Sequence, residues 1–440
     1  MNKKYDLIVV GAGPAGLMAA RVAGENGLKT ALLERKTDMT KISRTDGGNL
    51  SPVNEYLFGQ ITTFNPEAKR ISFPVSGFSI SYDGPYRDVY GFDLFSPGGK
   101  RIMFGDREKQ KKDPDKNRVG LSLDKRVLLQ GLLEDVEANG VDIFPGTNVT
   151  GIEKKEGRVV VTGNGEPFEG NFVIAADGVN SRIAHLMGMN KERTFFATYI
   201  DYAWYLDDIE IPEIQSVAFI ITMEGTFYVL STYDRNYYHV GVDSFNPKDN
   251  HIAKLNKFVY EDKVYSHWFK GCRKTGESAC VVTMLSPIKE PFKDNVLIIG
   301  DAAWLQEISN APAICCGWKA ANAVTLAHLD GKLNKDGVSS YLEWWEKYFY
   351  GPYGHIEFKP IEIQNFLNAD DIDYLAGLIK KPFPKTLNFY KLFSTIGNTY
   401  AELFPVIQEQ RPDVMEKLMG IVNQMDEIEK EARKAGFPNR

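Results

Sequence analysis

The order of apolar and polar positions divides the chain into three regions. An apolar run over residues 7–10 predicts a buried strand, followed by a glycine-rich loop, a helix and a second strand that ends at Glu34. Between residues 216 and 243, three runs of β-branched and aromatic residues, separated by the short turns "EGT" and "DRN", predict an antiparallel meander. From about residue 325 the pattern is helical. We therefore expect an α/β protein with an inserted antiparallel sheet and a helical C-terminal region.

The first strand, loop and helix read "LIVVGAGPAGLMAA", and Gly11, Gly13 and Gly16 match the pattern of a dinucleotide-binding unit. Gly11 allows a tight turn, Gly13 allows the backbone to approach a pyrophosphate, and Gly16 allows close packing of the helix. Glu34 is placed to bind an adenosine ribose, and its charge would repel a 2′-phosphate. The unit therefore favours FAD or NAD over NADP.

Two later segments place an aspartate beside a glycine directly after an apolar strand. They are "NFVIAADGVNSRIA", which contains Asp177, and "DNVLIIGDAAWL", which contains Gly300 and Asp301. Both would lie at the carboxyl ends of strands, where open α/β sheets bind ligands. An Asp-Gly pair after a strand is also an ordinary turn, so the role of Asp177 in cofactor binding has a structural alternative.

Together, these motifs resemble the flavoprotein superfamily of geranylgeranyl reductase and p-hydroxybenzoate hydroxylase over most of residues 1–330. The resemblance implies a Rossmann-like FAD-binding domain and identifies FAD as the cofactor. It implies that Asp301 binds the ribityl chain, that Arg126 meets the phosphates, and that the backbone of Val149 meets the adenine. The remaining residues that we expect beside FAD are Ala15, Arg35, Arg44, Pro312 and Gly317.

The same comparison predicts how the chain divides into domains. We expect residues 1–192 and 286–330 to form the FAD-binding domain, with the substrate-binding antiparallel sheet inserted over residues 193–285. A helical region would follow over residues 331–440.

The inserted sheet supplies the first catalytic candidates. In the resembled superfamily such a sheet covers the substrate above the flavin, so Tyr228 and His239 become candidates, although plain sheet packing is the commoner role of such residues. A third candidate is Asp46, in the loop "KISRTDGGNLSP" that we expect to pass the flavin. Arg44 and Asp46 could orient a polar substrate group, but we favour binding of FAD through nearby backbone amides.

Two of the four cysteines, Cys315 and Cys316, lie together in "NAPAICCGWKAANAV", at the expected start of a helix. A helix N-terminus lowers the pKa of a thiol, so catalysis by a thiolate is one interpretation. The interpretation that we weigh more heavily is that both cysteines are small apolar residues in a tight bend, because buried cysteines commonly behave in this way.

The sequence departs from the geranylgeranyl reductases in two places. Their loop cysteine is absent from "KISRTDGGNLSP", and "TFYVLSTY" stands where they have a Tyr-x-Trp-x-Phe-Pro motif. We expect an FAD-dependent oxidoreductase that reduces or desaturates a carbon–carbon bond in a hydrophobic or aromatic small molecule, with NAD(P)H or a ferredoxin-like protein as electron donor. The alternatives are an aromatic monooxygenase that uses NAD(P)H and oxygen, and a flavin electron-transfer protein.

Composition limits the remaining classes of partner. A net charge of -6 and a pI near 5.7 argue against nucleic acid binding, and the scattered histidines show no metal-binding pair. No apolar run approaches the roughly 18 residues of a membrane span, and with no secretory signal evident we expect a cytoplasmic protein. The aromatic residues Trp344, Trp345, Phe349 and Tyr350 predict a packed helix, with contact to a membrane surface as the alternative.

Overall fold

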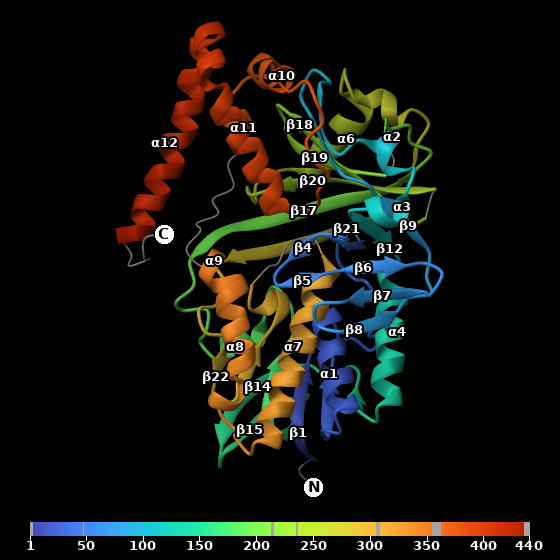
Figure 1. The fold of residues 1–440 in the computed structure, drawn as a ribbon, viewed down its shortest axis with the longest axis vertical. Coiled ribbons are helices and arrows are strands. Elements are labelled where there is room, and N and C mark those ends of the chain that lie inside the picture. The colour runs from blue at the N-terminus through green and yellow to red at the C-terminus, as the bar shows by residue number, and fades with distance from the viewer. Residues whose placement is uncertain are drawn as a thin grey trace.

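The computed structural model describes residues 3–46, 48–212, 215–234, 236–304, 309–353 and 362–434. Figure 1 shows two tiers: a mainly parallel sheet with its helices below, and an antiparallel sheet with the last helices above. This arrangement confirms the expected α/β class with an inserted antiparallel sheet and a helical C-terminal region.

The lower tier is built on parallel strands in the order β13 (Asp142–Phe144), β2 (Thr30–Leu33), β1 (Lys3–Val10), β16 (Glu166–Ala175) and β23 (Val296–Ile298). Antiparallel strands β14 (Val149–Lys155), β15 (Arg158–Gly163) and β22 (Phe292–Lys293) extend this sheet. The apolar run in β1 is continuous because Leu7, Ile8 and Val9 are all fully buried.

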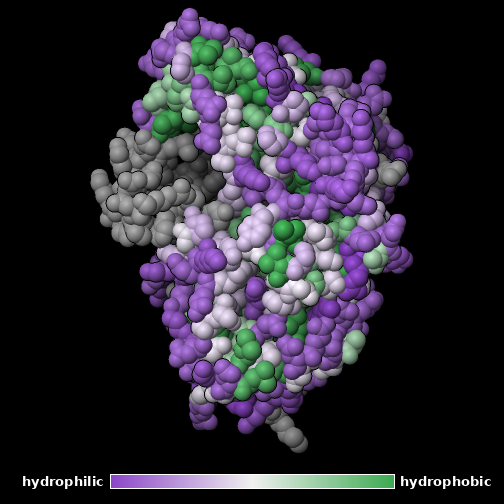
Figure 2. Space-filling model, viewed as in Figure 1, coloured by the Kyte–Doolittle hydropathy of each residue, from purple (hydrophilic) through white to green (hydrophobic). Residues whose placement is uncertain are grey.

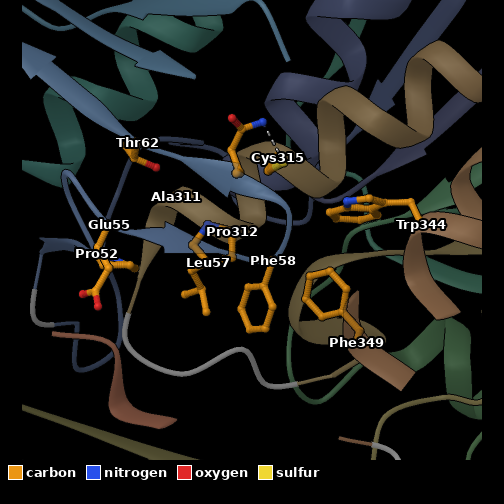
Figure 3. A pocket seen from close by; sticks show the side chains of 11 residues that line it. Pro52, Glu55, Leu57, Phe58, Thr62, Ala311, Pro312, Cys315, Trp344 and Phe349 are labelled. Carbon is orange, nitrogen blue, oxygen red and sulfur yellow. Dashed lines mark hydrogen bonds between the residues drawn. The ribbon is translucent and has the colours of Figure 1, made fainter. Parts of the chain in front are cut away.

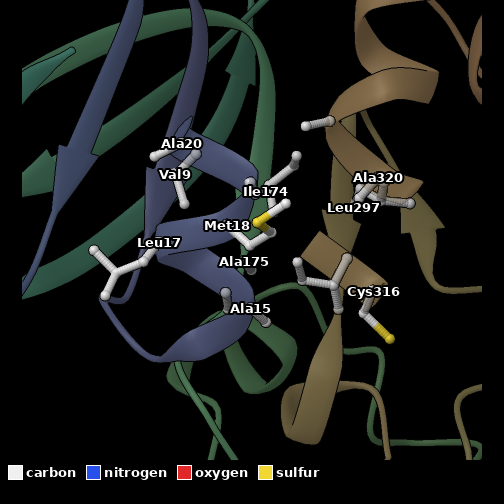
Figure 4. Packing of buried hydrophobic residues seen from close by; sticks show 14 of the residues in the cluster. Val9, Ala15, Leu17, Met18, Ala20, Ile174, Ala175, Leu297, Cys316 and Ala320 are labelled. Atoms are coloured by element: carbon white, nitrogen blue, oxygen red, sulfur yellow. The ribbon is translucent and has the colours of Figure 1, made fainter. Parts of the chain in front are cut away.

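Three helices lie side by side in front of this sheet: α1 (Pro14–Glu25), α4 (Lys125–Ala138) and α7 (Asn310–Leu329). Helix α1 starts with Pro14, whose fixed φ suits the first helical position. Helices α1 and α7 pack through small residues, and Figure 4 shows Cys316 and Ala320 of α7 opposite Ala15 and Met18 of α1. This contact packs α7, from the second part of the lower tier in the sequence, against α1, from its first part.

The upper sheet has seven strands in the order β11 (Arg101–Phe104), β10 (Phe92–Phe95), β18 (Val217–Thr222), β19 (Gly225–Ser231), β20 (Tyr237–Ser244), β17 (Phe195–Asp207) and β21 (Arg273–Leu285). The antiparallel pairing of β18 with β19 and of β19 with β20 confirms the meander. Strands β10 and β11, which come earlier in the chain, also belong to this sheet. The expected domain boundaries stay predictions.

The two faces of the upper sheet differ in character. One face packs on α6 (His251–Asn256), the π-helix η1 (Lys257–Glu261) and the 3-10 helix η2 (Ser266–Phe269), with the rings of Phe227 and Phe258 stacked 4.1 Å apart. Because side chains alternate along a strand, Tyr228, His239 and Asp201 lie on the opposite face. We call this opposite face the inner face.

Short strands and helices connect the tiers. The small sheets consist of β3 (Asn49–Leu50), β12 (Gly120–Leu123) and β9 (Tyr86–Val89); β4 (Tyr56–Leu57) and β5 (Gln60–Ile61); and β6 (Thr63–Asn65), β7 (Arg70–Phe73) and β8 (Phe78–Ser81). The short helices are α2 (Arg107–Gln110), α3 (Pro114–Asn117), α5 (Arg182–Leu186) and the 3-10 turn η3 (Gly300–Ala302).

The C-terminal elements are η4 (Asp336–Val338), α8 (Ser339–Trp345), η5 (Glu346–Tyr350), α9 (Gly351–Tyr353), η6 (Ile363–Asn365), α10 (Ala369–Leu378), α11 (Phe389–Gln410) and α12 (Pro412–Lys434). The predicted aromatic helix corresponds to α8, η5 and α9, and its last part, residues 354–358, lies outside the described residues.

The aromatic residues of α8 and η5 belong to the core. Trp344, Trp345, Phe349 and Tyr350 are all buried, so the packed helix is confirmed and membrane contact through these side chains is wrong. Within the described ranges, no helix combines the length and apolar character needed to cross a membrane. Figure 2 shows a mostly hydrophilic face, with apolar side chains gathered at the top where α10, α11 and α12 meet.

Candidate cofactor and active site

The glycine-rich loop between β1 and α1 is tightly packed at two glycines and open at the third. Gly11 has φ +101°, and an added Cβ would lie 2.4 Å from the carbonyl oxygen of Ala176. A Cβ on Gly16 would lie 1.8 Å from the Gly11 oxygen, whereas a Cβ on Gly13 would meet no atom within 4 Å. Gly13 therefore borders open space at the N-terminus of α1, where backbone N–H groups favour an anion such as a pyrophosphate.

Glu34 ends β2 and braces this loop from within. Its Oε2 accepts a hydrogen bond from the Ala12 N–H at 2.7 Å, and its Oε1 accepts one from the Lys36 N–H at 2.8 Å. Burial, together with the charge of nearby Lys125, lowers the pKa of Lys36, although Glu34 opposes that shift. The structure thus brings the cationic side chains of Lys36 and Lys125 close to the end of β2. Arg35 is exposed. The binding of an adenosine ribose by Glu34 stays a prediction.

The other predicted residues of the adenosine and phosphate end lie on separate elements. Arg126 is in the first turn of α4, with its Nη2 at 3.1 Å from Asp38 Oδ2, and both side chains are largely exposed. Val149 is buried at the start of β14, and Arg44 is exposed on the loop before β3. Their contacts with FAD stay predictions.

The two Asp-Gly motifs differ in role. Asp177 accepts hydrogen bonds from the Ser181 hydroxyl at 2.6 Å and from the Ile183 N–H at 3.1 Å, so it organises the start of α5, and burial raises its pKa. This is the turn-forming alternative that the sequence left open. Gly300 has φ +60° and begins η3 just after β23, which places Asp301 at the carboxyl end of the last parallel strand of the sheet.

The double cysteine lies within α7 and not at its start, because the helix begins at Asn310 with Ser309 as its N-cap. Pro312 occupies the first turn. Cys315 and Cys316 are buried, and burial raises the pKa of Cys315 to about 12. The expected lowering of this pKa is therefore wrong, because desolvation outweighs a helix terminus that is a full turn away. A Cβ on Gly317 would lie 2.1 Å from the Ala15 carbonyl oxygen, so this stretch serves close packing of α7 on α1.

The inner face of the upper sheet holds two of the catalytic candidates. Tyr228 donates a hydrogen bond to Asp201 Oδ1 at 2.7 Å. The His239 ring stacks on Tyr205 at 5.0 Å and meets Tyr228 edge-on at 5.6 Å, and its Nε2 is 3.5 Å from Ser278 Oγ. Burial lowers the pKa of His239 to about 4, so the ring is neutral at pH 7.

Asp46 lies on the loop that faces this sheet. It forms an ion pair with Lys125 and accepts a hydrogen bond from the Gly48 N–H at 2.9 Å. Burial alone would raise its pKa, but Lys125 and the hydrogen bonds lower it. The neighbouring Thr45 Oγ1 is 3.3 Å from Ser278 Oγ, so the loop touches the inner face, and Gly47 lies outside the described residues.

Sequence reasoning missed Asp201, Thr45, Ser278, Cys280 and Lys125. The signal at Asp201 was an acidic residue inside the apolar strand "FFATYIDYAWYLD", where alternation places it on the same face as Tyr199. The partners of these residues come from loops and strands far away in the chain, which no local pattern specifies.

A small apolar pocket lies beside the start of α7. It is lined by Pro52, Glu55, Leu57, Phe58, Gln60, Thr62, Ala311, Pro312, Cys315, Trp344 and Phe349. Figure 3 shows the Phe58 and Phe349 rings side by side. Gln60 Nε2 donates a hydrogen bond to Cys315 Sγ at 3.9 Å. Most of the lining is aromatic or aliphatic, which suits a hydrocarbon group.

Comparisons with known proteins show which proteins this chain is similar to. Residues 5–220 match the model of the pyridine nucleotide-disulphide oxidoreductase family. The chain is 24% identical over 418 residues to a digeranylgeranylglycerophospholipid reductase from Methanococcus vannielii, covering 89% of this chain and 98% of the relative. The corresponding reductase from Methanocaldococcus jannaschii is 23% identical over 86% of this chain and 90% of its own length.

Solved structures share the fold. A geranylgeranyl bacteriochlorophyll reductase-like protein from Thermoplasma acidophilum has a TM-score of 0.68 at 18% identity, with 96% of this chain and 100% of that chain covered. The halogenase PltM in complex with FAD has a TM-score of 0.62 at 12% identity, with 99% and 93% covered.

The fold and the site define an FAD-dependent oxidoreductase. The chain is similar to geranylgeranyl-type reductases along most of its length, which confirms the resemblance seen in the sequence. Its residues fit FAD, because the open space at Gly13 and the N-terminus of α1 suit a pyrophosphate. When bound, FAD would supply two-electron redox chemistry, and the protein would supply binding, orientation and electrostatics.

Proposed function

We propose that this protein reduces carbon–carbon double bonds in an apolar, isoprenoid-type lipid. The observation that carries the proposal is the aromatic and aliphatic pocket against the first turns of α7, beside the expected flavin site. The near full-length similarity to digeranylgeranylglycerophospholipid reductases supports the same substrate class.

The pocket suits a hydrocarbon chain for physical reasons. Phe58 stacks on Phe349 with ring centroids 4.4 Å apart, and Trp344 meets Phe349 at 4.9 Å, so the walls are rigid and apolar. Glu55, the charged residue of the lining, pairs with Lys391 at 2.6 Å and accepts a hydrogen bond from Thr386 at 2.8 Å. Burial of a small apolar group there would be favourable by about 25 cal/mol per Å² of apolar surface.

This chain lacks the loop cysteine of the reductases, so its proton donor would be another residue. The inner face of the upper sheet carries hydroxyl, imidazole and carboxyl groups, and the loop with Asp46 reaches it through Thr45. These residues orient and protonate the substrate, while the buried aromatic core excludes water.

An anaerobic assay tests this function. The protein is reduced with dithionite, mixed with digeranylgeranylglycerophospholipid vesicles, and followed by flavin absorbance and by mass spectrometry of the lipid. We expect the flavin to reoxidise and the lipid to gain pairs of hydrogens, while the fully saturated lipid gives no reaction. Reoxidation that requires oxygen and yields a hydroxylated aromatic would support the monooxygenase instead. Parallel reductions with NADH, NADPH and a reduced ferredoxin identify the electron donor.

A further inference from the structure

The inner face of the upper sheet contains a buried polar cluster that packing does not explain. Asp201, Tyr228 and His239 are 6%, 5% and 2% exposed. Among the described residues no lysine or arginine forms an ion pair with Asp201, and His239 Nδ1 has no hydrogen-bond partner. Burying a carboxyl group without a cationic partner and an imidazole nitrogen without a hydrogen bond costs free energy, and such perturbed groups cluster at functional sites.

The geometry of Tyr228 is specific. Tyr228 is on β19 and Asp201 is on β17, so the phenol must cross the intervening strand β20 to reach the carboxyl. It crosses at Gly241, where a Cβ would lie 2.1 Å from the tyrosine ring. Only glycine leaves room for this ring, so the strand is built to bring Tyr228 and Asp201 together.

The pair borders the loop that we expect beside the flavin. Thr45 Oγ1 donates a hydrogen bond to Ser278 Oγ at 3.3 Å, and Cys280 Sγ is 3.9 Å from Asp201 Oδ2. The other charged or titratable groups that face the pair are Tyr199, Asp243, Arg44 and Asp46. Burial raises the pKa of Asp201 to about 6, so this carboxyl holds a proton in part near neutral pH.

We propose that Asp201 and Tyr228 form the proton-delivery pair for the double-bond reduction, an inference that rests on the proposed function. One alkene carbon takes a hydride from the reduced flavin, and the other takes the proton of the Tyr228 hydroxyl. For this transfer the hydrogen bond reverses, so that the protonated Asp201 carboxyl donates to the Tyr228 oxygen; Asp201 then passes this proton to Tyr228, is left as a carboxylate and takes up one proton from the solvent. The alkene gains two hydrogens, the flavin loses two electrons, and Tyr228 ends the cycle protonated.

The test uses Asp201→Asn and Tyr228→Phe in the FAD-loaded protein. Tyr202→Phe is the matched control, because it removes a hydrogen bond of the same 2.7 Å length, to Glu277, from the opposite face of β17. In anaerobic single turnover with the unsaturated lipid, we expect both test variants to slow flavin reoxidation by roughly 10²–10⁴-fold at unchanged FAD content. The wild-type rate should fall as pH rises through about 6, and this dependence should disappear in Asp201→Asn.

Infrared titration gives a readout that is independent of turnover. A protonated-carboxyl band should disappear as pH rises through about 6 in the wild type and be absent from Asp201→Asn. In Tyr228→Phe the transition should move to higher pH, because the tyrosine hydrogen bond lowers the pKa of Asp201. Wild-type turnover with undiminished rates in both variants would overturn the pair alone, whereas no turnover by the wild type would overturn the proposed function.

Discussion

At the scale of single residues, the glycine-rich loop separates what the fold requires from what the cofactor requires. Gly11 and Gly16 each lie against backbone atoms of the protein, whereas Gly13 borders open space. The sequence motif predicts a separate role for each glycine, and the surroundings of the three glycines in the structure fit those roles.

We predict that Gly13→Val leaves the fold intact and impairs FAD binding. Gly13 has φ -76°, which valine tolerates, and the added side chain would fill the space expected for the pyrophosphate. Overpacking of about 1–3 kcal/mol corresponds to a loss of roughly 5- to 150-fold in FAD affinity. The flavin-to-protein absorbance ratio after purification measures this.

Gly16→Val is the contrasting variant, because its side chain would collide with Gly11 and should lower the thermal midpoint of unfolding even without FAD. Full yellow colour of Gly13→Val would show that the pyrophosphate does not lie at this loop.

At the scale of secondary-structure elements, the parts of the fold that depend on residues close together in the sequence could be predicted. The β1–α1–β2 unit and the meander of β18, β19 and β20 follow from local periodicity and turns. The start of α7 does not follow from local patterns, because its N-cap residue Ser309 accepts a hydrogen bond from the Ser51 N–H of a distant loop. The cluster around Asp201 also depends on strand order, which a single sequence does not reveal.

We predict that Gly317→Ala destabilises the protein by about 1–3 kcal/mol, because the new methyl group would collide with Ala15 in the contact between α7 and α1. Gly397→Ala is the matched control: Gly397 is exposed inside α11, with nothing within 4 Å of an added Cβ. The control should stabilise the protein by about 0.5–1 kcal/mol through helix propensity. Urea denaturation followed by circular dichroism measures the free energy of unfolding of both variants. Equal changes in the two variants would contradict the tight packing that we assign to Gly317.

At the scale of the whole molecule, the inner face couples stability to pH through two buried groups with opposite effects. The native state raises the pKa of Asp201 to about 6, so it binds this proton more tightly than the unfolded chain, and the stabilising contribution is lost as pH rises from about 4 to 6. The native state lowers the pKa of His239 to about 4. The stabilising contribution of His239 is therefore present above about pH 6.5 and is lost as pH falls towards 4.

These slopes largely cancel in the wild type, and single variants should separate them. Between pH 4 and pH 7, the free energy of unfolding of Asp201→Asn should rise more than that of the wild type, by up to about 3 kcal/mol. That of His239→Gln should rise less, by a similar amount. Urea denaturation at both pH values measures the change within each variant, so any constant cost of the substitution drops out. If the pH profiles of the wild type and of both variants were parallel, neither Asp201 nor His239 would have a pKa shifted by burial.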